Sequence, residues 1–205
     1  MKLMTITASL LLTTALMALS DDYRAYDTPV NYNYGMIAVG QTSLDDSDID
    51  AVAVVGGGEA MINENIIFDV FYSGAIINED SYDADTNSLS LGLSYRYGLT
   101  EKLDIVAGAD VVYGWYNVEP IIGNDTSDND FGYSLKSSLR YGFTRNFEGV
   151  LGVSYTDVFD DTATGINANI SYYFSESFAF GGAYGQVMSD TDDSSTYTAF
   201  VKVRF

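Results

Sequence analysis

The stretch from Tyr197 to Phe205 alternates strictly between two kinds of side chain. One parity holds Tyr, Ala, Val, Val and Phe, and the other holds Thr, Phe, Lys and Arg. Because side chains on a β-strand point alternately to opposite faces, this pattern predicts a strand with one apolar face and one mostly polar, cationic face. An exposed apolar strand is an aggregation hazard in water. The pattern therefore indicates that the apolar face contacts lipid.

The first twenty residues have the features of a secretory signal peptide. Lys2 precedes an apolar run over residues 3–19, and Ala18-Leu19-Ser20 forms a small-x-small cleavage site. The run is too short for a helix that crosses a bilayer. We therefore predict a cleaved signal peptide over 1–20, with an N-terminal anchor helix as the alternative. We expect a short periplasmic N-terminal extension over 21–31 and a single domain over 32–205.

Composition excludes several classes of protein. The net charge of −20 argues against nucleic-acid binding, which needs clustered Lys and Arg. There is no cysteine, so neither disulfides nor thiolate metal sites are available. Hydrophobic residues make up 47% of the chain, yet after the first twenty residues no stretch has the length and hydropathy of a transmembrane helix. Hydrophobicity spread by alternation in this way is typical of a membrane β-barrel.

The alternating segments predict about ten strands, each close to the length that a tilted strand needs to cross a membrane. The predicted strands cover residues 32–44, 51–62, 66–77, 88–99, 103–117, 131–143, 147–158, 164–174, 178–188 and 195–205.

The predicted connections alternate between two kinds. One kind is very short and covers residues 63–65, 100–102, 144–146 and 175–177. The other kind is longer and acidic and covers residues 45–50, 78–87, 119–130, 160–164 and 190–193. Short periplasmic turns that alternate with longer outer loops are the plan of an outer-membrane barrel. With an even number of strands, this plan predicts extracellular loops and two periplasmic termini.

A repeat at the scale of one hairpin supports this architecture. Arg96-Tyr-Gly-Leu-Thr and Arg140-Tyr-Gly-Phe-Thr each lead into a short turn and the start of a strand, and the repeat extends to Gly108 and Gly152. Together with the signal peptide and Phe205, this repeat resembles the small bacterial outer-membrane β-barrel superfamily, which includes OmpA-type and opacity-type barrels.

The resemblance implies an all-β fold, a closed antiparallel up-and-down transmembrane β-barrel in the bacterial outer membrane. The usual count in the smallest members is eight strands, so eight is the alternative to ten, with a bulge or kink near Gly56-Gly57-Gly58. It also implies a monomer that contacts outer-membrane lipid and lipopolysaccharide, and that the barrel-assembly machinery recognises through its C-terminal strand. It implies no cofactor.

Aromatic residues fall where strands would enter and leave the membrane. Amphipathic rings favour the headgroup level on both sides of a bilayer. We expect membrane-interface positions for Tyr97, Tyr113, Trp115, Tyr133, Tyr141, Phe143, Phe147, Tyr155, Phe174, Phe178 and Phe205.

Almost all charged residues within the predicted strands share the parity opposite to Phe205. A lipid-facing charge at the middle of a bilayer costs about 2–4 kcal/mol, so this sorting predicts that they line the lumen. The set is Glu59, Asp69, Arg96, Asp104, Asp110, Lys136, Arg140, Glu148, Lys202 and Arg204. Across the two repeated turns, Arg96 and Asp104 become diagonal neighbours, as do Arg140 and Glu148, so we expect these to form pairs.

These features predict a small passive channel or a structural barrel with a charged, salt-bridged lumen. The charges could form an ion-selective eyelet or a plug, and the size of the barrel favours the plug, because side chains just fill barrels of about eight strands. The alternative is an adhesin-like surface protein, or one that binds divalent cations or lipopolysaccharide, acting through its acidic loops. No loop has calcium-loop spacing. A soluble lipocalin-like barrel would need the reverse parity.

The chain contains no histidine. The outer-membrane proteases, phospholipases and acyl-modifying barrels use a histidine as base or as part of a triad. We therefore predict that the protein is not an enzyme and has no catalytic residues or metal site.

Overall fold

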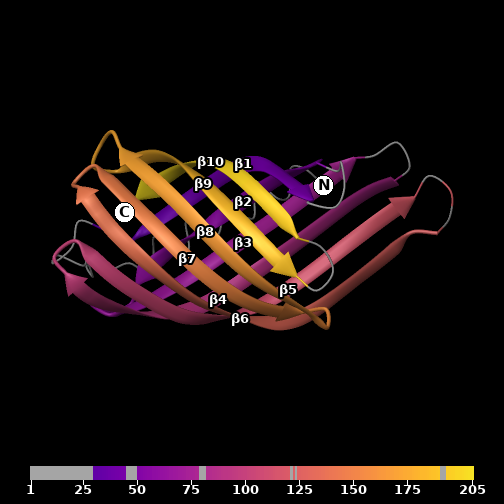
Figure 1. Cartoon of the computed structure of the whole chain (residues 1–205), viewed down its shortest axis with the longest axis horizontal. Coiled ribbons are helices and arrows are strands. Elements are labelled where there is room, and N and C mark those ends of the chain that lie inside the picture. Colours follow the sequence, from indigo (N-terminus) through magenta and orange to yellow (C-terminus); the bar gives the residue numbers. More distant parts are fainter. Residues whose placement is uncertain (1–29, 45–49, 79–81, 121, 123, 190–192) are drawn as a thin grey trace.

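The computed structural model describes residues 30–44, 50–78, 82–120, 122, 124–189 and 193–205, which form a closed antiparallel barrel of ten strands (Figure 1). Consecutive strands are neighbours, and β1 closes the barrel against β10. The strands are β1 (Tyr34–Leu44), β2 (Asp50–Met61), β3 (Ile66–Asn78), β4 (Tyr82–Thr100), β5 (Leu103–Pro120), β6 (Thr126–Thr144), β7 (Phe147–Val158), β8 (Asp161–Tyr173), β9 (Phe178–Ser189) and β10 (Ser194–Arg204).

This architecture confirms the predicted all-β barrel and its ten strands. The eight-strand alternative is wrong, because β2 runs unbroken through Gly56-Gly57-Gly58 and pairs with β1 and β3 along its length. None of the described residues forms a helix of the length and hydropathy needed to cross a membrane.

The acidic connections are shorter than the sequence predicts. Residues 82–87 belong to β4, residues 119–120 to β5 and residues 126–130 to β6. The loop expected over 160–164 is instead a tight turn at Phe159 and Asp160, with φ angles of 59° and 56°, and β8 starts directly after it. The sequence did not predict these strand ends, because they are polar throughout. A strand that extends beyond the membrane faces water on both sides, so its apolar and polar residues need not alternate. The remaining acidic residues at 45–49, 79–81 and 190–192, like the predicted signal peptide, lie outside the described residues.

As a consequence, β4, β5 and β6 are 18 or 19 residues long, whereas the other strands have 11 to 13. Pairing between β6 and β7 begins only at Tyr133 and Asp157, so the first residues of β6 pair with β5 alone. The three long strands thus form a projecting sheet that reaches beyond the barrel wall (Figure 1).

Short turns connect the strands at the opposite end, called here the turn end, and one side chain stabilises each turn. The hydroxyl of Thr100 accepts hydrogen bonds from the backbone N–H groups of Lys102 and Leu103, at 3.2 and 3.0 Å. Thr144 does the same for the N–H of Asn146 in the second copy of the repeat, at 3.2 Å. The threonine of the repeated motif is therefore a turn residue, because its hydroxyl replaces a backbone partner.

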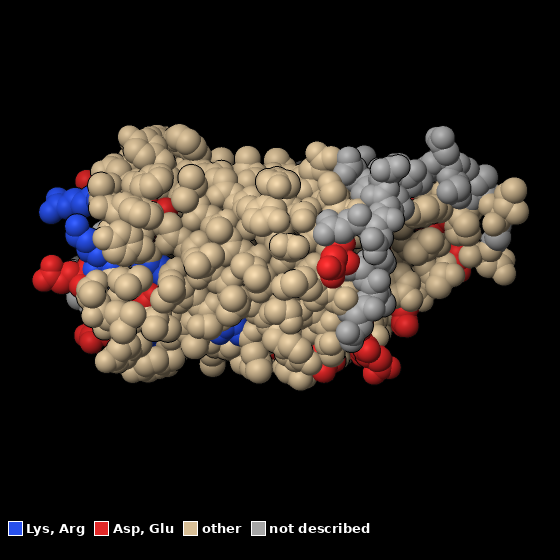
Figure 2. Space-filling view, in the orientation of Figure 1, with Lys and Arg blue, Asp and Glu red and all other residues tan. Residues whose placement is uncertain are grey.

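The outer surface carries a broad apolar band. Leu91 and Leu93 on β4, Leu139 on β6 and Leu151 on β7 are all exposed. Figure 2 shows that charged side chains gather mainly near the two ends, while the face between them is largely uncharged. In water such a band would promote aggregation, whereas it matches the hydrocarbon layer of a bilayer.

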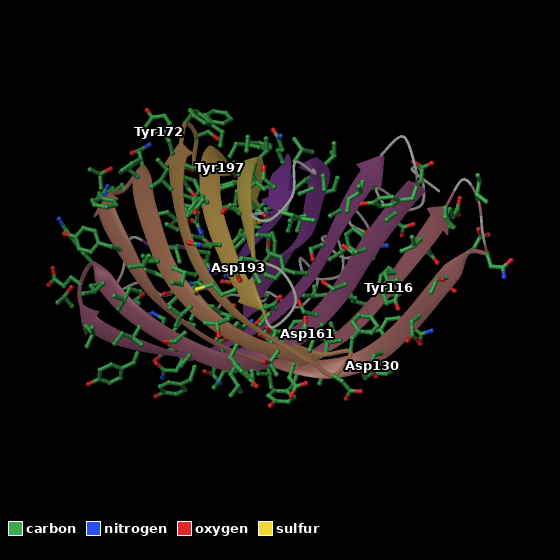
Figure 3. All side chains as sticks on the ribbon, turned by 45° about the vertical axis from the view of Figure 1, so that its right-hand side comes forward. Tyr116, Asp130, Asp161, Tyr172, Asp193 and Tyr197 are labelled. Atoms are coloured by element: carbon green, nitrogen blue, oxygen red, sulfur yellow. The ribbon has the colours of Figure 1, made fainter. Side chains whose placement is uncertain are left out.

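Aromatic rings flank this band at two levels. At the turn end, the ring of Phe143 lies 4.8 Å from that of Tyr141 and 5.2 Å from that of Phe147. Nearer the projecting sheet, the Tyr113 ring lies 5.5 Å from the Trp115 ring. Figure 3 shows Tyr172 outside the barrel near one end and Tyr116 and Asp130 toward the other.

The remaining predicted interface residues also lie at the surface. Tyr97, Tyr133, Tyr155, Phe174 and Phe178 have exposed side chains, and Phe205 is half-buried.

Candidate functional site in the barrel interior

The ten charged residues selected by parity all take part in ion pairs inside the barrel, in its half nearer the turn end. The pairs combine five acidic with five basic side chains. Seven of the ten residues are buried, and Lys136, at 29% side-chain exposure, is the most accessible of the set. Strand alternation puts them there, since each one has the parity of its strand that points away from the apolar band.

Arg140 on β6 and Glu59 on β2 form the widest bridge. Two guanidinium nitrogens of Arg140 donate to the two carboxylate oxygens of Glu59 at 2.6 and 2.7 Å. These strands are four positions apart in the barrel order, so the pair crosses the interior rather than following the wall. Such a two-point contact fixes both position and orientation.

Lys136 makes a second bridge from β6. Its ammonium lies 2.6 Å from Asp69 on β3 and 2.6 Å from Asp110 on β5. One cation between two carboxylates leaves this layer with a formal net charge of −1. That surplus favours a cation over an anion at this depth of the interior.

Glu148 on β7 is the centre of a third group. Lys202 on β10 donates to one of its carboxylate oxygens at 2.7 Å, and the hydroxyl of Tyr173 donates to the same oxygen at 2.9 Å. Arg204 lies 3.9 Å from the other oxygen, and its guanidinium stacks over the Tyr173 ring, 3.2 Å from the centroid. Ion pairs between β7 and β10 again span the interior.

Of the two pairs expected across the repeated turns, only one forms. Arg96 contacts Asp104 through two hydrogen bonds, at 2.9 and 3.1 Å. The expected pair of Arg140 with Glu148 is wrong, although the two are diagonal neighbours in the β6–β7 register. Both side chains point into a closed interior, where a partner across the lumen offers better geometry than the diagonal neighbour.

Residues 30–33 enter the turn end of the barrel before β1 begins. The side chain of Tyr32 is almost completely buried, and its hydroxyl donates to Asp104 at 2.7 Å. Its ring lies below two guanidinium groups, 4.9 Å from that of Arg140 and 5.8 Å from that of Arg96. Burial raises the pKa of the Tyr32 hydroxyl well above its ordinary value, which keeps the hydroxyl protonated as a donor.

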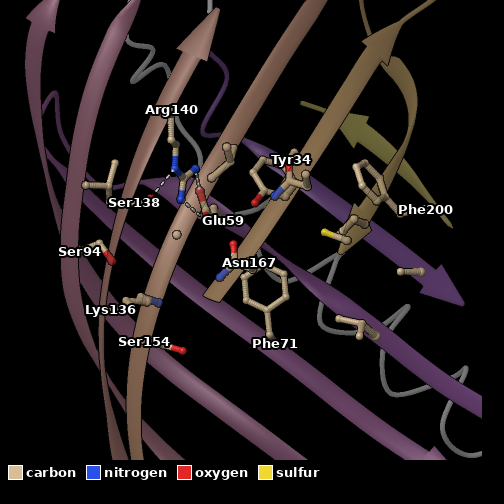
Figure 4. A pocket seen from close by; sticks show the side chains of 18 of the residues that line it. Tyr34, Glu59, Phe71, Ser94, Lys136, Ser138, Arg140, Ser154, Asn167 and Phe200 are labelled. Atoms are coloured by element: carbon tan, nitrogen blue, oxygen red, sulfur yellow. Dashed lines mark hydrogen bonds and ion pairs between the residues drawn. The ribbon is translucent and has the colours of Figure 1, made fainter. Parts of the chain in front are cut away.

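A cavity of about 460 Å³ lies inside the barrel beside the ion pairs (Figure 4). Lys136, Arg140 and Glu59 border it, together with small polar side chains such as Ser154 and Asn167. The rings of Tyr34, Phe71 and Phe200 complete its wall. Its volume is that of a small ligand site, but charged bridges cross the lumen beside it.

This arrangement holds the interior charges in fixed pairs. Among the described residues, no group of three or more acidic side chains is placed to hold a metal ion. Each interior carboxylate faces a cation, and Asp69 and Asp110 share one, Lys136.

Sequence reasoning missed the interior tyrosines. Tyr32, Tyr34 and Tyr173 all contact the charged cluster. The signal was available for all three, because Tyr32 and Tyr34 share the inward parity of β1 and Tyr173 has the inward parity of β8. Their role was hidden, because a tyrosine is as typical of the membrane interface as of a polar interior.

Comparisons with known proteins agree with this architecture. A family model described as outer membrane protein beta-barrel domain matches residues 6–174. No curated protein sequence matches the chain.

Several solved structures are similar to it, and the following three are among them. The translocator domain of autotransporter NalP from Neisseria meningitidis has a TM-score of 0.51 and 11% identity, over 98% of this chain and 97% of that chain. The COG4313 outer membrane channel from Pseudomonas putida F1 has a TM-score of 0.50 and 11% identity, over 90% of this chain and 98% of that chain. Neisserial surface protein A has a TM-score of 0.45 and 16% identity, over 84% of this chain and 95% of that chain.

At 11% identity the first two of these structures show a shared fold and nothing finer. The family model, by contrast, covers most of the chain and agrees with a closed barrel that has an apolar band. The chain belongs to the outer membrane protein beta-barrel domain family.

Proposed function

We propose that the protein is a structural barrel of the bacterial outer membrane whose lumen is closed by ion pairs, rather than an open porin. One observation carries this proposal: three sets of ion pairs cross the interior, between β2 and β6, between β3, β5 and β6, and between β7 and β10. An open porin keeps a water-filled channel, whereas these bridges occupy the space that a solute would need.

The energetics favour a persistent closure. Removing one partner of a buried ion pair costs about 3–5 kcal/mol, because a lone charge is left in a poorly solvated place. A passage wide enough for a solute would require several such pairs to separate together. The two-point contact between Arg140 and Glu59 adds to this cost, since both hydrogen bonds must break.

Potassium efflux from loaded liposomes tests the closure. We expect liposomes that contain the folded wild-type protein to lose potassium no faster than protein-free liposomes. The double variant Glu59→Ala/Arg140→Ala removes the widest bridge without leaving a lone charge and should raise the efflux. A matched lipid-facing pair, Leu91→Ala/Leu139→Ala, should not. Wild-type efflux that grows with the amount of protein would refute the proposal.

A second candidate function, binding of a cationic partner at the cell surface, is favoured by the projecting sheet. Asp83 on β4 stands directly opposite Glu119 on β5 in the strand register, and both residues are exposed. Like charges at opposite positions destabilise a sheet, so a cationic group between them would relieve the repulsion. In this proposal the projecting sheet is extracellular and both termini are periplasmic.

Binding of a fluorescent oligo-lysine peptide to intact cells that express the protein tests this candidate. The triple variant Asp83→Asn/Glu119→Gln/Asp128→Asn should bind less peptide than wild type. The matched variant Glu64→Gln/Glu101→Gln/Glu176→Gln removes the same charge from the turn end. It should bind as wild type does if that end faces the periplasm. Equal binding by all three proteins would exclude the sheet as the binding surface.

A further inference from the structure

Residues Val30–Asn33 leave the barrel wall and fold into its turn end. Pairing of β1 with β10 begins only at Tyr34 and Arg204, so the preceding residues are not part of the sheet. Val30, Tyr32 and Asn33 nevertheless have exposed fractions of 5%, 1% and 4%. A segment that precedes a strand is usually poorly ordered unless something ties it down.

Hydrogen bonds from three places anchor the backbone of this segment. The side-chain oxygen of Asn33 accepts from the N–H of Met61 at the end of β2, at 2.8 Å. The carbonyl of Asn33 accepts from the N–H of Phe205, at 3.2 Å. The N–H of Asn31 donates to the Glu148 carboxylate on β7, at 3.4 Å. The segment therefore crosses the turn end of the barrel and contacts β2, β7 and the C-terminal residue Phe205.

Tyr32 fills the space below the charged cluster. It packs with Val30, Met61, Ile67 and Val106 in a buried apolar group. Its hydroxyl is bonded to Asp104, and its ring faces Arg96 and Arg140, as described above. An apolar ring against charged groups excludes water from the layer that ion pairs alone would leave hydrated.

We infer that residues Val30–Asn33 are a built-in stopper that seals the turn end of the lumen, and that their release opens a path for small ions. Ion pairs bridge the lumen, and the segment fills the gaps between the bridges with apolar and tyrosine side chains. It is held by local contacts rather than by strand pairing, so it can leave without unfolding the barrel.

A single cysteine at Ile67 measures whether the segment covers the turn end. The natural chain has no cysteine, so a charged, water-soluble thiol reagent reacts only at the introduced site. Ile67 is buried in the apolar group around Tyr32. In detergent micelles, where both ends are accessible, Ile67→Cys should react slowly. Adding Tyr32→Ala should speed the reaction by about tenfold to a hundredfold, because a hydrogen bond to a charged group contributes that much to a local opening equilibrium.

Conductance in a planar bilayer measures whether this segment also blocks the passage of ions through the lumen. Tyr32→Ala should produce stable steps that the wild type lacks. Tyr32→Phe keeps the ring over the guanidinium groups and loses the hydroxyl, so it should open less often. Tyr97→Ala removes a lipid-facing tyrosine and serves as the matched control, which should behave as wild type.

This inference rests on the proposed closed barrel, and the two measurements separate their failures. Conductance by the wild type would refute the closed barrel while leaving the cysteine test intact. Rapid reaction of Ile67→Cys with Tyr32 in place, or equally slow reaction after Tyr32→Ala in a protein that still folds, would refute the stopper. So would silence of folded Tyr32→Ala in the bilayer.

Discussion

At the scale of single residues, Arg140 illustrates what a closed interior demands. Its side chain is only 12% exposed, and it meets Glu59, which is 81 positions away in the chain. Burying an ion pair is costly unless the geometry compensates both charges. The protein therefore uses the pair less to add stability than to fix which strands face each other across the lumen.

Glu59→Gln should lower the free energy of unfolding by about 3 kcal/mol or more, because Arg140 is left buried without a counter-charge. Urea unfolding in lipid vesicles, followed by the fluorescence of the single tryptophan, Trp115, measures this change. The double variant Glu59→Leu/Arg140→Met should recover most of the loss. A single variant as stable as wild type would show that the pair is hydrated rather than buried.

Two glycines on β9 offer a second test of interior packing. A Cβ at Gly181 would overlap the carbonyl oxygen of Ile170 and the ring of Phe200, whereas the nearest atom to a Cβ at Gly185 is 3.9 Å away. Gly181→Ala should therefore lower the free energy of unfolding by about 1–3 kcal/mol, the usual range for overpacking. Gly185→Ala, on the same strand, should be nearly neutral, and an equal loss in both would contradict the packing described here.

The alternation of side chains along each strand predicted which charged residues point into the barrel. It did not predict which residues they pair with. Period-two alternation is local, so the inward direction of Lys136 or Asp69 can be read from a few neighbours. The partner of Arg140 depends on the curvature of the whole barrel, which no local pattern encodes. For the same reason, the contact of Tyr32 with Asp104 could not be predicted, although its inward parity could.

At the scale of elements, the turns and the strand ends differ in how far they could be predicted. The short turns carry their own signal, because Thr100 and Thr144 each accept a hydrogen bond from the backbone N–H two residues further on, in both copies of the repeat. The outer ends of β4, β5 and β6 lack a signal, since beyond the membrane neither face needs to be apolar. The acidic residues there indicated loops where the structure has strands.

The turn between β7 and β8 gives a prediction at this scale. Asp160 adopts a positive φ of 56°, a conformation that costs a non-glycine residue about 1–2 kcal/mol. Asp160→Gly should therefore raise the free energy of unfolding by about 0.5–1 kcal/mol, after allowing for the entropy of glycine in the unfolded chain. Asp160→Ala should instead lower it. Thermal or urea unfolding measures both changes. If the two variants changed the free energy of unfolding in the same direction, the assigned turn would be contradicted.

At the scale of the whole molecule, the barrel separates its surfaces by chemistry. Membership of the outer membrane protein beta-barrel domain family places it in the bacterial outer membrane. An apolar band faces outward, ion pairs occupy the interior, and an acidic sheet projects from one end. The closed architecture was predictable from the sequence because alternation, turn spacing and charge parity all favour it independently.

We propose that charged bridges and the Tyr32 segment together close this lumen. Conductance of the folded wild-type protein in a planar lipid bilayer under a salt gradient tests it most directly. We expect no stable current steps from the wild type, and we expect stable steps from Tyr32→Ala under the same conditions. Stable wild-type steps with a measurable reversal potential would show instead that the barrel is an open channel.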